Sequence, residues 1–246
     1  MNRRDASLLL GSWATLGGSL LSPRLFAADG PPRLVLGQRN STADGQKNGL
    51  AHTHAARVEL THSKPESMSV IITGVAAAAG YPLDMSRAAV HCEVSQLVRV
   101  VGGGKDRVKL VMDSQLVGQL SCSRDGEGVA SLAAANASLM LEGNPVLGVD
   151  FQGRTHSGRD NTYINDKLEP SIAIVDPGDY ILIEHFVIEC SHPKRCFHKN
   201  VAMAYFGPDE GKPPEWLNYL AAHRDAPKAK ELGFRVTLRV ESAAVS

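Results

Sequence analysis

The densest group of side chains able to bind a metal lies between residues 185 and 203. It contains imidazoles, thiols and a thioether, from His185, Cys190, His192, Cys196, His198 and Met203. Nitrogen and sulfur ligands of this kind suit copper and zinc. One hypothesis is therefore a metal-binding or redox protein with copper or zinc as its cofactor. His52 and His54 would share one face of a strand and could add further imidazoles.

Within this group, Cys196, His198 and Met203 follow one another along a chain rich in predicted strands. This order resembles the copper ligands of the cupredoxin family, which lie on a β-sandwich. The spacing departs from the family pattern, because a single residue separates Cys196 from His198. The alternative interpretation is structural: a disulfide closes the loop around His192, and Met203 lies in a core strand.

The cysteines are Cys92, Cys122, Cys190 and Cys196, and an even number is typical of disulfide-bonded exported proteins. The sequence alone leaves every pairing open. We expect Cys92–Cys122 and Cys190–Cys196, because each pair is close in the chain and falls in neighbouring predicted strands or in one loop. The alternative is a set of buried thiols, since cysteine packs as a small hydrophobic residue.

The longest stretch without clear hydrophobic periodicity runs from residue 153 to 170. Its candidate ligand-binding side chains are His156, Arg159, Asp160, Asn161 and Tyr163. A polar loop of this length is uncommon in a compact domain and is often functional. We expect a contact surface formed by loops 153–170 and 191–199, unless the first of these is only a solvated excursion.

Residues 1–28 have the layout of an export signal. Arg3 and Arg4 precede an apolar run from Leu8 to Leu21, and small residues follow at Ala27 and Ala28. The paired arginines resemble a twin-arginine signal, with a general secretory signal as the alternative. The signal predicts a location in the bacterial periplasm or outside the cell. We expect no membrane span in the mature chain, because no second apolar run of spanning length occurs.

The rest of the chain predicts a mainly β protein. Apolar and polar residues alternate with period two, as in the segments 58–61, 68–73, 87–101 and 234–241. We expect a β-sandwich of Greek-key or jelly-roll type spanning 55–246, with a short helical excursion near 213–232. Residues 29–54 are expected to be a polar linker, and Ala76–Ala79 a loop or helical turn. A division into two domains near 143–148 is the alternative.

The sequence Asp176-Pro177-Gly178-Asp179-Tyr180 precedes a strongly alternating segment. It resembles the tyrosine corner of Greek-key sandwiches, in which the phenol hydroxyl bonds to the chain just upstream. The resemblance implies a structural role for Tyr180 and carries no information on activity.

The composition and the motifs narrow the range of possible functions. Lys and Arg number 26, as do Asp and Glu, so no basic excess favours a nucleic-acid partner. The sequence has neither a Gly-x-Ser-x-Gly nor a His-Glu-x-x-His motif. We therefore expect a non-enzymatic exported binding or accessory protein whose ligand is a protein or a carbohydrate. The alternatives are the metal-binding or redox protein and a sandwich-fold polysaccharide hydrolase.

Overall fold

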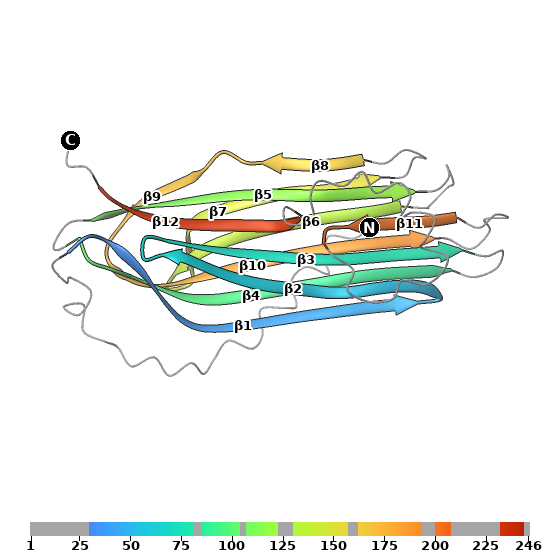
Figure 1. Cartoon of the computed structure of the whole chain (residues 1–246), viewed down its shortest axis with the longest axis horizontal. Helices are drawn as coiled ribbons and strands as arrows, with labels where there is room; N and C mark the ends of the chain where they lie inside the picture. Colours follow the sequence, from blue (N-terminus) through green and yellow to red (C-terminus); the bar gives the residue numbers. More distant parts are fainter. Residues whose placement is uncertain are drawn as a thin grey trace.

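The computed structural model describes residues 30–80, 85–103, 107–122, 130–156, 162–192, 200–207 and 232–243. These residues form two antiparallel sheets whose strands run along the long axis of the molecule (Figure 1). The expected mainly β sandwich is confirmed. The expected helical excursion near 213–232 lies almost wholly outside the described residues, as does the whole export signal.

Sheet A has five strands. Their order across the sheet is β1 (Arg33–Asn48), β4 (Ser86–Val101), β10 (Gly178–His192), β6 (Ala130–Leu141) and β7 (Asn144–His156). Sheet B contains β2 (Leu50–Lys64), β3 (Ser67–Gly80), β11 (Asn200–Tyr205), β12 (Gly233–Ser242), β5 (Val108–Cys122), β8 (Thr162–Lys167) and β9 (Ser171–Val175). The alternative domain boundary near 143–148 falls at the start of β7, which pairs with β6 across the preceding turn.

Period-two burial in β10 shows why these segments form strands. Tyr180 and every second residue after it face the interior, ending with His192. The intervening side chains are half-buried on the outer face of sheet A. Tyr180 also makes the expected corner, because its hydroxyl donates a hydrogen bond to the Asp176 carbonyl at 2.6 Å. Burial raises the pKa of this phenol to about 12.

The alanine run in β3 was expected to be a loop or helical turn, and this is wrong. Ala76–Ala79 continue the strand as far as Gly80. Ala76 and Ala78 face the interior between the sheets, whereas Ala77 and Ala79 belong to a second apolar cluster on the opposite face. Because both faces are buried, the segment shows a continuous apolar pattern in place of the alternating one.

The polar segment 29–54 was expected to be a linker, but most of it is strand. β1 pairs with β4 along nearly its whole length, and β2 begins directly after a turn at Gly49, where φ is 68°. The side chains of β1 after Leu36 are exposed on both faces. A strand at a sheet edge that is held mainly by backbone hydrogen bonds leaves little hydrophobic periodicity to detect.

Strands β11 and β12 lie end to end between the same two neighbours. β11 pairs with the C-terminal half of β3 and with the end of β5, and β12 pairs with the remaining parts of both. The chain leaves this line after Gly207 and returns at Gly233. Both glycines contact Thr73, and a side chain at either position would overlap β3.

Glu184 is a carboxyl group in the interior of the sandwich. It lies in the middle of β10, between Val94 and Ala137, and its side chain is fully buried. Neither carboxyl oxygen has a hydrogen-bond partner among the described residues. This burial raises its pKa from 4.5 to about 8, so the group is mainly protonated at neutral pH.

We expect Glu184 to make the stability of the protein decrease as the pH rises. Between pH 4.5 and about 8 the folded state holds a proton that the unfolded state has lost. The free energy of unfolding should therefore fall by about 5 kcal/mol across this window. Urea unfolding at several pH values should show this slope in the native protein and not in Glu184→Gln.

Glu93→Gln is the matched control, because Glu93 lies on the outer face of the adjacent strand and is partly exposed. Its pH dependence should follow that of the native protein. Parallel pH profiles for the native protein and Glu184→Gln would contradict the prediction.

Candidate functional site

The two loops expected to form a contact surface are anchored at the same end of the sandwich. β7 ends at His156 and β8 begins at Thr162, whereas β10 ends at His192 and β11 begins at Asn200. Strand pairing connects these ends, because Cys190 lies opposite Ser131, which in turn lies opposite His156. All four strand ends lie toward the right of Figure 1. The end of the molecule that carries them is called the loop end below.

The expected ligand-binding residues fall partly within the described structure. His156 Nδ1 and Thr162 Oγ1 are 2.8 Å apart and join the two strand ends that flank residues 157–161. Tyr163 is the next residue on β8, and its side chain is 47% exposed. Arg159, Asp160 and Asn161 lie outside the described residues. The segment 153–170, expected to be irregular, is largely formed by the end of β7 and by β8.

The base of the loop end is tightly packed. His192 is fully buried, and a Cβ placed on Gly80 would lie only 1.8 Å from its ring. The Ser86 hydroxyl donates a hydrogen bond to the Ala79 carbonyl beside it. His192 is therefore part of the packed interior. The sequence predicts it in a loop or in a metal site instead.

The structure does not bring the described members of the expected metal cluster together. His185 lies on the outer face of sheet A, with Nδ1 3.8 Å from a Glu93 carboxylate oxygen. Cys190 faces the interior, and Met203 belongs to the apolar cluster on the outer face of sheet B.

No group of three or more His, Cys, Asp or Glu side chains in the described ranges is placed to hold a metal ion. Cys196 and His198 lie outside those ranges. His52 is half-buried on β2, opposite Ala77 on β3. The side-chain position of His54 is not part of the described structure.

The expected disulfides are not formed. Cys92, Cys122 and Cys190 are buried thiols. The sequence predicts a Cys92–Cys122 disulfide because the two cysteines fall in strands that are neighbours in the sequence. In the fold, however, β4 lies in sheet A and β5 in sheet B. The Cys190 thiol donates a hydrogen bond to the Ala76 carbonyl at 3.2 Å and is not bonded to Cys196. Burial raises the pKa of Cys92 and of Cys122 to about 11, and that of Cys190 well above its ordinary value.

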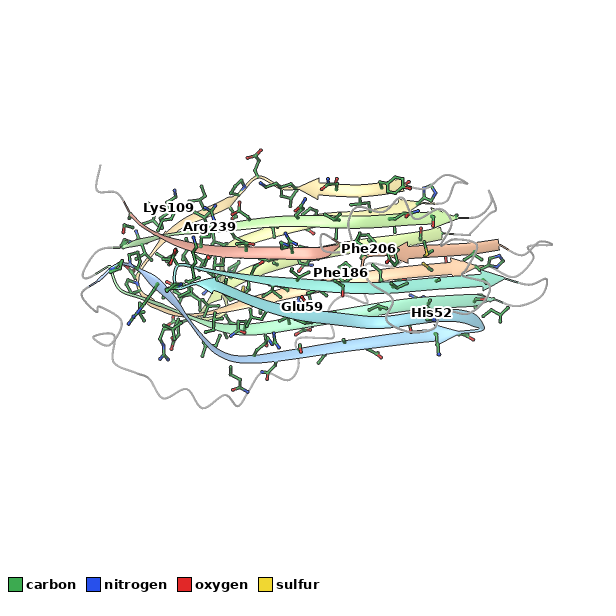
Figure 2. The ribbon with its side chains drawn as sticks, viewed as in Figure 1. His52, Glu59, Lys109, Phe186, Phe206 and Arg239 are labelled. Atoms are coloured by element: carbon green, nitrogen blue, oxygen red, sulfur yellow. The ribbon has the colours of Figure 1, made fainter. Side chains whose placement is uncertain are left out.

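Sequence analysis missed a ladder of charged groups on the outer face of sheet B. Arg239 contacts Asp113 at 2.8 Å and Glu241 at 3.5 Å, and Lys109 contacts Glu241 at 2.9 Å. Figure 2 labels Lys109 and Arg239 toward the end opposite the loop end. The sequence offered one signal for this ladder, the polar residues that alternate with apolar ones in β12. The groups that pair with them come mainly from β5, which is distant in the sequence.

A shallow hollow of about 340 Å³ adjoins this ladder. It is lined by Asp113, Ser114, Gln115, Lys167, Arg235, Thr237 and Arg239. The ladder itself has two basic groups and two carboxylates, whereas the hollow is lined by three basic side chains and one carboxylate, Asp113. Exposed ion pairs of this kind contribute little to stability.

Another hollow, of about 540 Å³, lies at the end opposite the loop end. Its walls come from residues 30–33, 65–66, 102 and 240–242. Prolines and glycines form much of this wall, and its ionisable groups are Arg33, Glu66 and Glu241. The lining also includes the hydroxyl group of Ser242.

Comparisons with known proteins do not identify a family. No family model and no curated protein matches the chain. Among solved structures, it is similar to the enzymatically active domain of bacteriophage CBA120 tailspike protein 4. The identity is 13%, the TM-score is 0.21, and the match covers 68% of this chain and 19% of that one.

A structure of infectious bursal disease virus, Gx strain, matches at 9% identity with a TM-score of 0.23. That match covers 87% of this chain and 61% of the viral one. The chain thus spans less than two thirds of either structure. At these TM-scores the similarities carry no information on function.

Separately, the described part of the chain contains no helix long and apolar enough to cross a membrane.

We expect the three described thiols to resist alkylation in the folded protein. Burial and raised pKa values leave little reactive thiolate at about pH 8. Iodoacetamide followed by mass spectrometry should find Cys92, Cys122 and Cys190 unmodified in native protein. All three should be modified in guanidinium chloride without reductant. A peptide pair joined through Cys92 and Cys122 would contradict the thiol assignment.

Proposed function

We propose that this protein is an exported, non-enzymatic β-sandwich that binds a protein or carbohydrate ligand at its loop end. One observation carries the proposal: the strand ends that flank residues 157–161 and 193–199 meet at the same end of the molecule. Two loops that are separate in sequence would therefore form one surface. Binding sites are often built in this way, on loops held by a rigid sandwich.

The chemistry of the flanking residues supports contact with a ligand. Tyr163 presents an exposed phenol, which provides apolar area together with a hydrogen-bonding group. His156 and Thr162 place an imidazole and a hydroxyl beside it. The packed base around His192 and Gly80 would hold this rim in position, so that little conformational entropy is lost on binding.

The first experiment locates the contact surface in living cells. The photocrosslinker p-benzoylphenylalanine replaces Tyr163 at the loop end and, in a control protein, Glu66 at the opposite end. A covalent adduct to a protein or a glycan should form at position 163 and not at position 66. Adducts at position 66 alone would overturn the proposed surface.

Once that ligand is known, we expect Tyr163→Ala to weaken binding about tenfold, or ~1.4 kcal/mol, as for an aromatic interface residue. Ile172→Ala is the matched control. Ile172 is 57% exposed on β9, which pairs with the opposite end of the same strand, β5. Calorimetry should show unchanged affinity for this variant. Turnover of the ligand by the purified protein would overturn the non-enzymatic assignment.

Export is tested separately by replacing both signal arginines. Arg3→Lys with Arg4→Lys should leave unprocessed protein in the cytoplasm of a bacterial host, as measured by fractionation and mass spectrometry. Arg24→Lys, in the same segment, should be exported and processed normally. Export of the double variant would exclude the twin-arginine route, and retention of all three proteins would overturn export.

A further inference from the structure

The hollow of about 340 Å³ on sheet B forms where the edge of this sheet changes from one strand to another. β8 pairs with β5 from Gln115 onward, whereas β9 pairs with β5 only as far as Met112. In the described structure, Asp113 and Ser114 have no strand partner on this side, and the Leu168 amide donates a hydrogen bond of 3.4 Å to the Ser114 carbonyl. Figure 1 shows β8 and β9 following one another along β5 with a bend between them. The hollow beside this bend is called the edge hollow below.

Strand register places two cations of the edge hollow on either side of Gln115. Lys167 of β8 and Arg235 of β12 are both direct partners of Gln115 on β5. Directly opposed residues of neighbouring strands point to the same face of a sheet. Because neighbouring strands lie about 4.8 Å apart, the Cα atoms of Lys167 and Arg235 are separated by roughly 10 Å. Two long basic side chains at this separation can both reach one ligand placed over Gln115.

Arg239 contributes the third cation of the edge hollow, and Asp113 contributes the carboxylate. Arg239 Nε and Nη2 donate hydrogen bonds of 3.1 and 2.8 Å to Asp113 Oδ2. Three basic side chains against one carboxylate give the described lining a net charge of +2. This excess is local, because the formal net charge of the whole chain is zero. The described lining of the edge hollow therefore attracts an anion.

The other described lining residues are polar and uncharged. They are Ser114, Gln115 and Thr237, so the described lining has no apolar or aromatic side chain. Single-stranded nucleic acids use aromatic stacking, and protein partners use buried apolar or aromatic anchors. The Gln115 amide is held by a hydrogen bond of 2.8 Å to Asn165 Oδ1, and its oxygen can accept a hydrogen bond from a hydroxyl group. A ligand with an anionic group and several hydroxyls fits this chemistry, and an acidic sugar has both.

We propose that the edge hollow binds a uronic acid unit of an acidic polysaccharide, with Lys167 and Arg235 on its carboxylate and Gln115 on a hydroxyl. Lysine and arginine recognise carboxylates through charge-assisted hydrogen bonds. The site goes beyond the loop end proposed above, because its lining includes no residue of that surface. Tyr163 of the loop end lies four residues before Lys167 on β8, roughly 13 Å away.

Calorimetry with the purified full-length protein tests the site. The probe is trigalacturonate, and its neutral counterpart is a galactose trimer. Trigalacturonate should bind, and its affinity should fall several-fold between about 20 and about 200 mM sodium chloride, because salt screens exposed charges. Absence of binding at low salt would overturn the proposal, as would equal affinity for the neutral trimer.

Three variants locate the binding. Lys167→Gln and Arg235→Gln should each weaken trigalacturonate binding about fivefold, as expected for the loss of one exposed charge interaction. Lys47→Gln is the matched control, because Lys47 is exposed on β1 in sheet A. It should bind like the native protein. Equal affinities for all three variants would overturn the location, and Lys167→Gln decides if Arg235→Gln does not fold.

A fourth variant should change the affinity in the opposite direction. Asp113→Asn removes the carboxylate of the described lining and releases Arg239 from its ion pair. Trigalacturonate should therefore bind several-fold more tightly, which a merely structural role of these residues does not predict. Unchanged or weaker binding by the folded variant would overturn the electrostatic basis of the site.

Competition distinguishes the sources of the anionic group. An aspartate trimer, acetylated and amidated at its ends, carries the carboxylates without the sugar hydroxyls. It should compete several-fold more weakly than trigalacturonate, and so should sodium sulfate. Equal competition by the peptide would reassign the site to acidic peptides, and equal competition by sulfate would reassign it to inorganic anions. Either result would overturn the sugar assignment.

Discussion

The close approach of β3 to β10 is the constraint on which the rest of the sandwich depends. The Cys190 sulfur lies 3.2 Å from the Ala76 carbonyl oxygen of the opposite sheet, so there is no room for a further side-chain layer. At Gly74 an added Cβ would touch Phe186 and Ile188, and at Gly80 it would overlap His192. The alanines and glycines of β3 thus allow large side chains of β10 to fill the interior. Packing of this density makes added or removed carbon atoms costly.

β10 extends this close packing along the length of the sandwich. It begins with the hydrogen bond from Tyr180 to Asp176 and ends with the buried ring of His192. Between these points it pairs with β4 on one side and β6 on the other without a break in register. The strand ends beside it are therefore fixed relative to one another, and this alignment brings the loop flanks together. Glu184, in the middle of the same strand, places a fully buried carboxyl group in this packing, and its burial raises its pKa to about 8.

The line formed by β11 and β12 shows how two strands that are separated in the sequence can occupy one position in a sheet. Both β3 and β5 find hydrogen-bonding partners on each side of the break, so little of their backbone loses its pairing. The edge-to-face pairs Phe206–Phe186 and Phe234–Phe151 hold the junctions, and the glycines at both junctions pass close to Thr73 where no Cβ fits.

By itself, the sequence determined which side chains face inward in the alternating strands, and it identified the tyrosine corner. Both depend on local physics: side chains of a strand alternate with period two, and Tyr180 bonds to a residue four positions away. Only the tertiary structure decided which strands are neighbours. It separated Cys92 from Cys122, spread His185, Cys190 and Met203 over different faces, and gave β1 and the alanine end of β3 their partners. Pairing between distant strands uses backbone hydrogen bonds common to every residue, and burial on both faces removes the alternation. The local sequence pattern therefore indicates neither which strands pair nor which strands are buried on both faces.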